Sequence, residues 1–182
     1  MSKRFVVAAV LAAVMLVGAA GKASALPESP VHPGGLGIGV LWGMGFADGH
    51  STSNIALSLK HPAMPIFWGI SLQLRENWMG FGVTGDAYWW GGYLVDTIFG
   101  WYLGLGLYGN FAAYTGSGPD EAWLGLGGRL PMGLTFQPFD PLEIFLTLAP
   151  SLGVRIGTGG GADDFAFDDS FFNFEFGIRL WF

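Results

Sequence analysis

The sequence predicts an all-β protein, a transmembrane antiparallel up-and-down β-barrel of eight strands. Over most of residues 36–182, large apolar side chains alternate with small, polar or charged ones, which is the period of 2 that a β-strand produces. The chain is 51% hydrophobic and carries 31 glycines, and a glycine in a helix interior costs about 1 kcal/mol relative to alanine. The charged residues share one face of the strands, so the apolar face points outward and requires a lipid environment.

The last expected strand, residues 171–182, shows this inverted pattern most clearly. One face carries six large apolar side chains: Phe172, Phe174, Phe176, Ile178, Leu180 and Phe182. The opposite face carries Asn173, Glu175, Gly177, Arg179 and Trp181. A strand of a soluble sandwich would bury its apolar face, whereas a membrane barrel would enclose the small and charged face. We therefore expect the apolar face of this strand to contact lipid.

Residues 1–25 are predicted to be a secretory signal peptide. Lys3 and Arg4 precede an apolar stretch at residues 5–17, and the small residues 23–25 form a cleavage site. An uncleaved membrane anchor is the alternative, but the apolar stretch is shorter than the roughly 20 residues of a membrane span. The chain has no cysteine, so we expect no disulfide and no lipoprotein anchor.

The mature chain is expected to consist of a proline-rich periplasmic lead-in at residues 26–35 and an outer-membrane barrel at residues 36–182. The expected strands are residues 36–46, 54–60, 66–75, 79–90, 98–113, 122–136, 143–157 and 171–182. An even number of strands places both ends of the barrel in the periplasm. Pro131 lies within the sixth strand and predicts a bulge or a break in the ladder.

Two points of this assignment remain open in the sequence. Residues 91–97 connect the fourth and fifth strands, and the alternation does not show where either strand ends. A multi-helix membrane protein is the second fold considered, with residues 98–113 as its best span. Alternation of period 2 within that span favours a strand.

Charged residues in the strands predict a filled lumen. The basic residues that follow the signal peptide all take the inward parity of a strand: Lys60, Arg75, Arg129, Arg155 and Arg179. Asp86, Glu143 and Glu175 take the same parity. Side chains fill the interior of an eight-stranded barrel, and buried charges require partners. Strand positions suggest that Glu143 pairs with Arg179, and that Glu175 pairs with Arg129 or Arg155. A narrow channel or small-solute transporter through this charged lumen is the alternative function.

The connections expected outside the cell are acidic. Residues 47–53, 76–78, 114–121 and 158–170 carry aspartate and glutamate but no lysine or arginine. The last and longest of them contains Asp163, Asp164, Asp168 and Asp169. Such a loop could bind a basic partner. It could also bind Ca²⁺, but the spacing of its acids differs from that of a known calcium loop. A solvated acidic loop without a ligand explains the composition more simply, and we assign no metal ligand and no cofactor.

Catalysis is not expected. The histidines are His32, His50 and His61, and only His50 has neighbours, Asp48 and Ser51, that could assist it. Such a polar cluster is a common turn composition, and no Gly-x-Ser-x-Gly motif occurs. A lipid-modifying outer-membrane enzyme is therefore less probable than a structural or binding role. We also expect no nucleic-acid partner and a monomer.

The whole mature chain resembles the small eight-stranded bacterial outer-membrane barrels of the OmpA-transmembrane-domain, OmpX and OmpW type. The segments 129–134 and 142–153 are also similar to a spirochaete family of small barrel proteins. The resemblance implies a location in the bacterial outer membrane, contact with its lipid, and a C-terminal Phe182 that the barrel-assembly machinery reads. It further implies surface exposure, with an adhesin-like role in binding a host or other extracellular ligand. It supplies no catalytic residues.

Overall fold

The computed structural model describes residues 34–47, 50–75, 78–114, 116, 122–158, 165–168 and 172–182. All regular structure within these residues is β-sheet. The strands are β1 (Gly37–Ala47), β2 (His50–Lys60), β3 (Phe67–Arg75), β4 (Trp78–Val95), β5 (Phe99–Tyr114), β6 (Ala122–Arg129), β7 (Met132–Phe139), β8 (Leu142–Ala149), β9 (Ser151–Thr158), β10 (Phe165–Asp168) and β11 (Phe172–Trp181). The described part of the chain has no helix long and apolar enough to cross a membrane; that search does not address strands.

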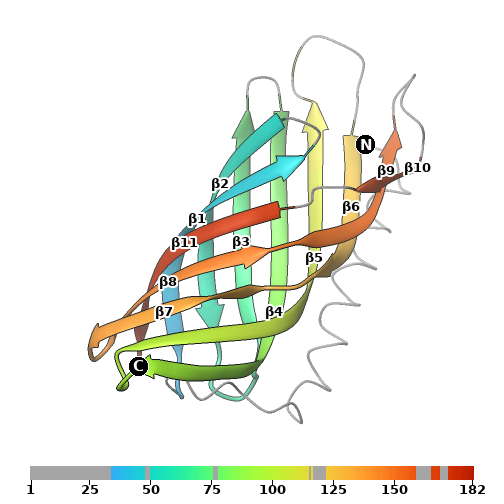
Figure 1. Ribbon diagram of the computed structural model, residues 1–182. Coiled ribbons are helices and arrows are strands. Elements are labelled where there is room, and N and C mark those ends of the chain that lie inside the picture. Colours follow the sequence, from blue (N-terminus) through green and yellow to red (C-terminus); the bar gives the residue numbers. More distant parts are fainter. Residues whose placement is uncertain are drawn as a thin grey trace.

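These strands form one closed antiparallel barrel (Figure 1). β1 to β5 pair in chain order, β5 pairs with both β6 and β7, and these pair with β9 and β8 respectively. β8 then pairs with β11, and β11 pairs with β1, which closes the ring. β6 and β7 occupy one position in the ring, and so do β9 and β8. The barrel therefore has eight strands, and the predicted fold class is confirmed.

The eighth strand of the barrel begins earlier than the sequence predicts, because β10 continues the line of β11. β10 pairs with β9 through Asp168 opposite Gly153, and β11 pairs with β8 through Asn173 opposite Ala149. β9 and β8 each pair through one edge with β6 and β7, respectively. Their other edge is the one that pairs with β10 and β11, so β10 and β11 occupy the same position in the ring. The prediction of one long loop at residues 158–170 is therefore wrong. Small and acidic residues in that stretch have the composition of a loop although part of it is strand.

Two other connections that were predicted to lie outside the cell are short in the structure. β1 and β2 pair as far as Ala47 opposite His50, so residues 50–53 belong to a strand and not to a loop. β3 and β4 pair as far as Arg75 opposite Trp78. Polar, β-compatible residues such as threonine can extend a strand beyond an apolar belt, where the alternation of apolar residues no longer marks them.

Residues 91–97 are mostly strand. β4 continues to Val95, and a turn at residues 96–98 leads into β5. The pairing of β4 with β5 shifts between Tyr88 and Trp90, and again between Tyr93 and Val95. Each shift inserts one residue and exchanges the faces that the following side chains occupy. The two bulges explain why the alternation breaks while the strand continues.

Two prolines interrupt neighbouring strands at the same height of the wall. Pro131 separates β6 from β7, as the sequence predicts, and Pro150 separates β8 from β9, which the sequence analysis missed. Gly104 N donates to Pro131 O at 2.8 Å, Leu130 N donates to Pro150 O at 2.9 Å, and the Ser151 hydroxyl donates to Ala149 O at 3.0 Å. Because proline has no N–H, the interruption exposes few unpaired backbone groups, which a lipid environment would penalise strongly.

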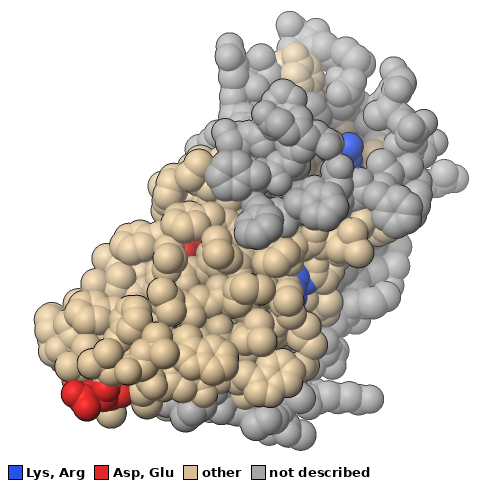
Figure 2. All heavy atoms as spheres, in the orientation of Figure 1, with Lys and Arg blue, Asp and Glu red and all other residues tan. Residues whose placement is uncertain are grey.

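The outer face of the barrel is apolar and exposed. Val40, Ile55, Leu72 and Leu152 are 59–69% exposed. On the side seen in Figure 2, the described residues are almost all uncharged, and the largest charged patch lies at the end of the barrel near the C-terminus. Ile66 is an exception to the predicted outward set, because it is 8% exposed and packs with Met64 and Trp68 just before β3.

Candidate functional site

The lumen is organised by aromatic side chains that cover glycines on the next strand of the ring. The pairs are Tyr88 with Gly104, Tyr102 with Gly133, Tyr108 with Gly127, Phe145 with Gly177, and Trp181 with Gly37. A Cβ added at Gly133 would lie 2.6 Å from the Tyr102 ring, and one at Gly104 would lie 2.8 Å from Tyr88. In four pairs the aromatic residue lies on the earlier strand, and in the fifth it lies on β11, which precedes β1 around the closed ring. Each aromatic residue is therefore displaced from its glycine in the same direction around the barrel.

Four aromatic residues form a buried layer across the lumen, toward the end where β2 meets β3 and the chain ends. They are Phe67, Tyr88, Tyr102 and Trp181. Ring centroids of Phe67 and Tyr88 are 4.5 Å apart, those of Tyr88 and Tyr102 are 4.6 Å apart, and those of Phe67 and Trp181 are 6.2 Å apart. All four side chains are 1–7% exposed, so the layer is packed in the interior and is shielded from bulk water.

Glu143 on β8 is the acceptor at the centre of this layer. It is 0% exposed, and its carboxylate accepts hydrogen bonds from Arg179 Nη1 at 2.8 Å, Trp181 Nε1 at 2.8 Å and the Thr135 hydroxyl at 2.8 Å. Parity predicts the pairing of Glu143 with Arg179, and the structure contains it. The sequence does not single out Thr135 as a partner, although its hydroxyl and the carboxylate of Glu143 lie close together on the paired strands β7 and β8.

Arg179 fills the space between the acid and the rings. Its Nη2 donates to the Ser58 hydroxyl at 2.9 Å, and its guanidinium carbon lies 4.7 Å from the Phe67 centroid and 4.5 Å from the Phe145 centroid. A guanidinium at these distances from aromatic faces is stabilised by their quadrupoles. The side chain is therefore held by an ion pair, by the Ser58 hydroxyl and by ring faces at once.

A second charged group lies beside the first. Arg129 Nη2 donates to Glu175 Oε1 at 2.7 Å, and Arg129 Nε lies 3.2 Å from Asp86 Oδ1. Of the two alternatives that the sequence leaves open for Glu175, the structure contains the pairing with Arg129. The contact of Arg129 with Asp86 lacks hydrogen-bond geometry at either atom. One arginine thus serves two carboxylates, firmly at Glu175 and loosely at Asp86.

The remaining predicted lumen residues divide into three cases. Lys60 is buried at 1% exposure and has an interaction partner. Arg155 is exposed, with its guanidinium carbon 6.0 Å from the Trp123 ring centroid, so it is not one of the buried charged residues. Parity gives the face of a side chain but not its depth, and Arg155 lies on β9 beyond the proline break. The Arg75 side chain lies outside the described residues.

The other predicted site residues lie at the two ends of the barrel. Asp163, Asp164 and Asp169 fall outside the described residues, and Asp168 is described only as a backbone position in β10. Phe182 is 72% exposed, and its backbone exchanges hydrogen bonds of 2.9 Å with Leu36. No group of His, Asp or Glu with a metal-binding arrangement occurs within the described ranges.

Fold and lumen together define a small closed antiparallel β-barrel with a filled, charge-paired interior. The chain belongs to the family described as "Protein of unknown function (DUF3996)", whose profile matches residues 32–182. A comparison with curated proteins finds no match. Among solved structures the chain is similar to the crystal structure of Neisserial surface protein A, from Neisseria, with 12% identity and a TM-score of 0.43 over 81% of this chain and 96% of the other. A TM-score this low does not support a conclusion about this chain. The assignment of a barrel therefore rests on the strand pairing.

Proposed function

We propose that the chain is a monomeric bacterial outer-membrane barrel whose work is done at its outer end and not through its lumen. The observation that carries this proposal is the inversion of polarity: charged side chains are enclosed while large apolar side chains face outward. Val40 is 59% exposed and Ile55 is 69% exposed, whereas Glu143 and Lys60 are almost fully buried. This distribution is stable when the surroundings of the barrel are apolar.

Aromatic residues near the ends of the outer wall support the membrane placement. Trp90, Trp101 and Phe139 are 39–64% exposed near the turns at residues 96–98 and 140–141. Trp42 is 42% exposed farther along β1 and donates to the Ser53 hydroxyl at 2.8 Å. Membrane barrels carry such aromatic girdles at both lipid–water interfaces.

The lipid-facing wall is tested by introducing one charge in its middle. Val40→Lys should lower the free energy of unfolding in lipid vesicles by about 2–4 kcal/mol, because a lysine near the bilayer midplane must be dehydrated. Thr97→Lys, in an exposed turn, is the control and should change it by less than about 0.5 kcal/mol. Both free energies are measured by urea unfolding, with the folded fraction read from the gel shift between unboiled and boiled protein. Equal, small effects would contradict the membrane placement.

Binding at the acidic outer end is the finer part of the proposal. The aromatic layer, together with Arg179 and Glu143 beside it, fills this part of the lumen. We therefore expect a ligand to bind at the rim of the barrel. The connections that we expect at this rim contain many aspartate and glutamate residues and no lysine or arginine. Such a rim favours a basic protein or peptide, since opposite charges steer association and set specificity.

The rim is tested by neutralising the acids of its last connection. Asp163, Asp164, Asp168 and Asp169 are replaced together by asparagine, because deletion of residues 159–169 would remove the paired strand β10. Polylysine binding to vesicles that contain the barrel should weaken at least about tenfold, at roughly 0.4 kcal/mol for each exposed charge. Asp96→Asn with Asp140→Asn, exposed at the other end, is the matched control. An equal loss in both variants would argue against a specific rim.

Conduction through the lumen is the competing function, and the buried aromatic layer argues against it. We expect planar bilayers containing folded barrel to show no discrete current steps. The protein used should show the folded band on an unboiled gel. An absence of current then cannot be attributed to misfolded protein that failed to insert. Reproducible steps that disappear when the protein is boiled would show that the layer opens and would favour the channel.

A further inference from the structure

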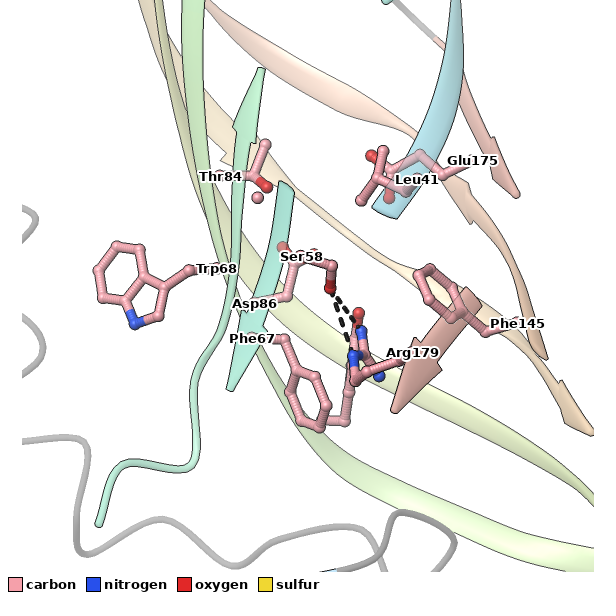
Figure 3. Close-up of a pocket in the computed structure, with 11 residues that line it drawn as sticks. Leu41, Ser58, Phe67, Trp68, Thr84, Asp86, Phe145, Glu175 and Arg179 are labelled. Carbon is pink, nitrogen blue, oxygen red and sulfur yellow. Dashed lines mark hydrogen bonds between the residues drawn. The ribbon is translucent and has the colours of Figure 1, made fainter. Parts of the chain in front are cut away.

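A small cavity of about 10 Å³ lies beside the charged groups of the lumen (Figure 3). Its polar lining comes from three strands. These residues are Ser58 on β2, Thr84, Asp86 and Tyr88 on β4, and Glu175 and Arg179 on β11. Its apolar lining includes Leu41, Phe67 and Phe145. A volume of this size corresponds to about one water molecule. The cavity is therefore too small for an organic solute.

One carboxylate at this cavity has unused acceptor capacity. Asp86 is 3% exposed, and its Oδ1 has no hydrogen-bond donor although Arg129 Nε lies 3.2 Å away. Arg129 is aligned instead on Glu175, at 2.7 Å. An ionised carboxylate accepts at about four positions, and leaving a buried acceptor without a donor is costly. The site thus calls for a small donor.

The charge balance of the lumen decides what kind of donor fits. Among the described groups, the buried cations Lys60, Arg129 and Arg179 are matched in number by the buried acids Asp86 and Glu143 together with Glu175, whose side chain is 12% exposed. An added cation would leave this set with an unmatched positive charge. A neutral donor leaves the balance intact, and Ser58 and Thr84 supply hydroxyl groups with which it can exchange hydrogen bonds.

We infer that this cavity is a specific binding site for a single water molecule, which donates to Asp86 and is hydrogen-bonded to the hydroxyl groups of Thr84 and Ser58. The water completes the coordination of the carboxylate that Arg129 meets only loosely. It also joins the group around Arg129 to the group around Arg179, so the two form one hydrogen-bonded network across the lumen.

The test is a crystal structure of the full barrel in detergent, at a resolution that shows ordered water. We expect one density peak in the cavity, about 2.6–3.2 Å from two to four polar atoms that include an Asp86 oxygen. No peak with the lining residues ordered would overturn the inference. A peak with six or more oxygen ligands near 2.3–2.6 Å, occupied only when a metal salt is present, would identify a cation and overturn it as well.

Variants distinguish a specific site from a chance hydration position. Gly69→Ala places a Cβ 2.5 Å from Thr84 Oγ1, which should push that hydroxyl into the cavity and remove the peak. Gly128→Ala, whose Cβ would meet nothing closer than 3.9 Å, should leave the peak unchanged. If Gly69→Ala does not fold, Thr84→Val serves in its place, and the peak should lose occupancy or one partner. A peak unchanged in the variant that folds would contradict the proposed ligands.

Discussion

Replacement of Glu143 by alanine is expected to lower the free energy of unfolding by about 3–5 kcal/mol, the cost of removing one partner from a buried ion pair. The change leaves Arg179, which is 3% exposed, without its counter-ion. It also removes the acceptor for Trp181 Nε1 and for the Thr135 hydroxyl. Urea titration of the refolded barrel, read from the folded fraction on unboiled gels, measures the loss.

A double variant separates the lost interaction from the penalty of the stranded charge. Glu143→Leu combined with Arg179→Met removes both charges and keeps similar volume. It should recover more than half of the loss seen for Glu143→Ala, because apolar replacements of a buried ion pair are often tolerated. A loss of less than about 1 kcal/mol for Glu143→Ala would contradict the role of this carboxylate as the centre of the layer.

Replacement of Gly133 by alanine is expected to cost close to 3 kcal/mol, the upper part of the usual range for overpacking. The added Cβ would meet the carbonyl oxygen of Leu146 and would lie 2.6 Å from the Tyr102 ring. A backbone atom cannot move aside as cheaply as the end of a flexible side chain. Tyr102 must also give up its position beside Thr147, to whose hydroxyl oxygen its own lies at 2.6 Å.

Gly128→Ala is the matched control for that substitution, because its Cβ would meet nothing closer than 3.9 Å. It should change the free energy of unfolding by no more than about 0.5 kcal/mol. The same urea titration measures both variants. Equal costs at the two positions would show that loss of glycine itself, and not the contact with Tyr102, is responsible.

The sequence predicts the wall of this barrel well wherever the strands are regular. A period of 2 fixes the face of each side chain, so Lys60, Arg129, Glu143 and Arg179 could be assigned to the lumen without a structure. The order of strands then brings Arg179 and Glu143 together, because β8 and β11 are neighbours in the ring and the two residues are register partners.

Three features could not be predicted from the alternation. Bulges at Trp89 and Leu94 reverse the parity within β4, and a pattern of period 2 has no means of showing an inserted residue. Polar residues at 50–53 and 165–168 extend strands beyond the apolar belt and look like loops. Arg155 shares the inward face of Arg129, but its height along the strand leaves it exposed.

The pairing of β1 with β11 has a consequence for how the barrel forms. Every other pairing joins strands that are close in the chain, so each can form soon after its turn. Only this seam joins the first described strand to the last, and it ends with Leu36 bonded to Phe182 in both directions. Contacts between distant parts of a chain form slowly, because the entropy of loop closure must be overcome first. The seam should therefore be the last pairing made, and a kinetic intermediate would be an open, curved sheet with these two edges free.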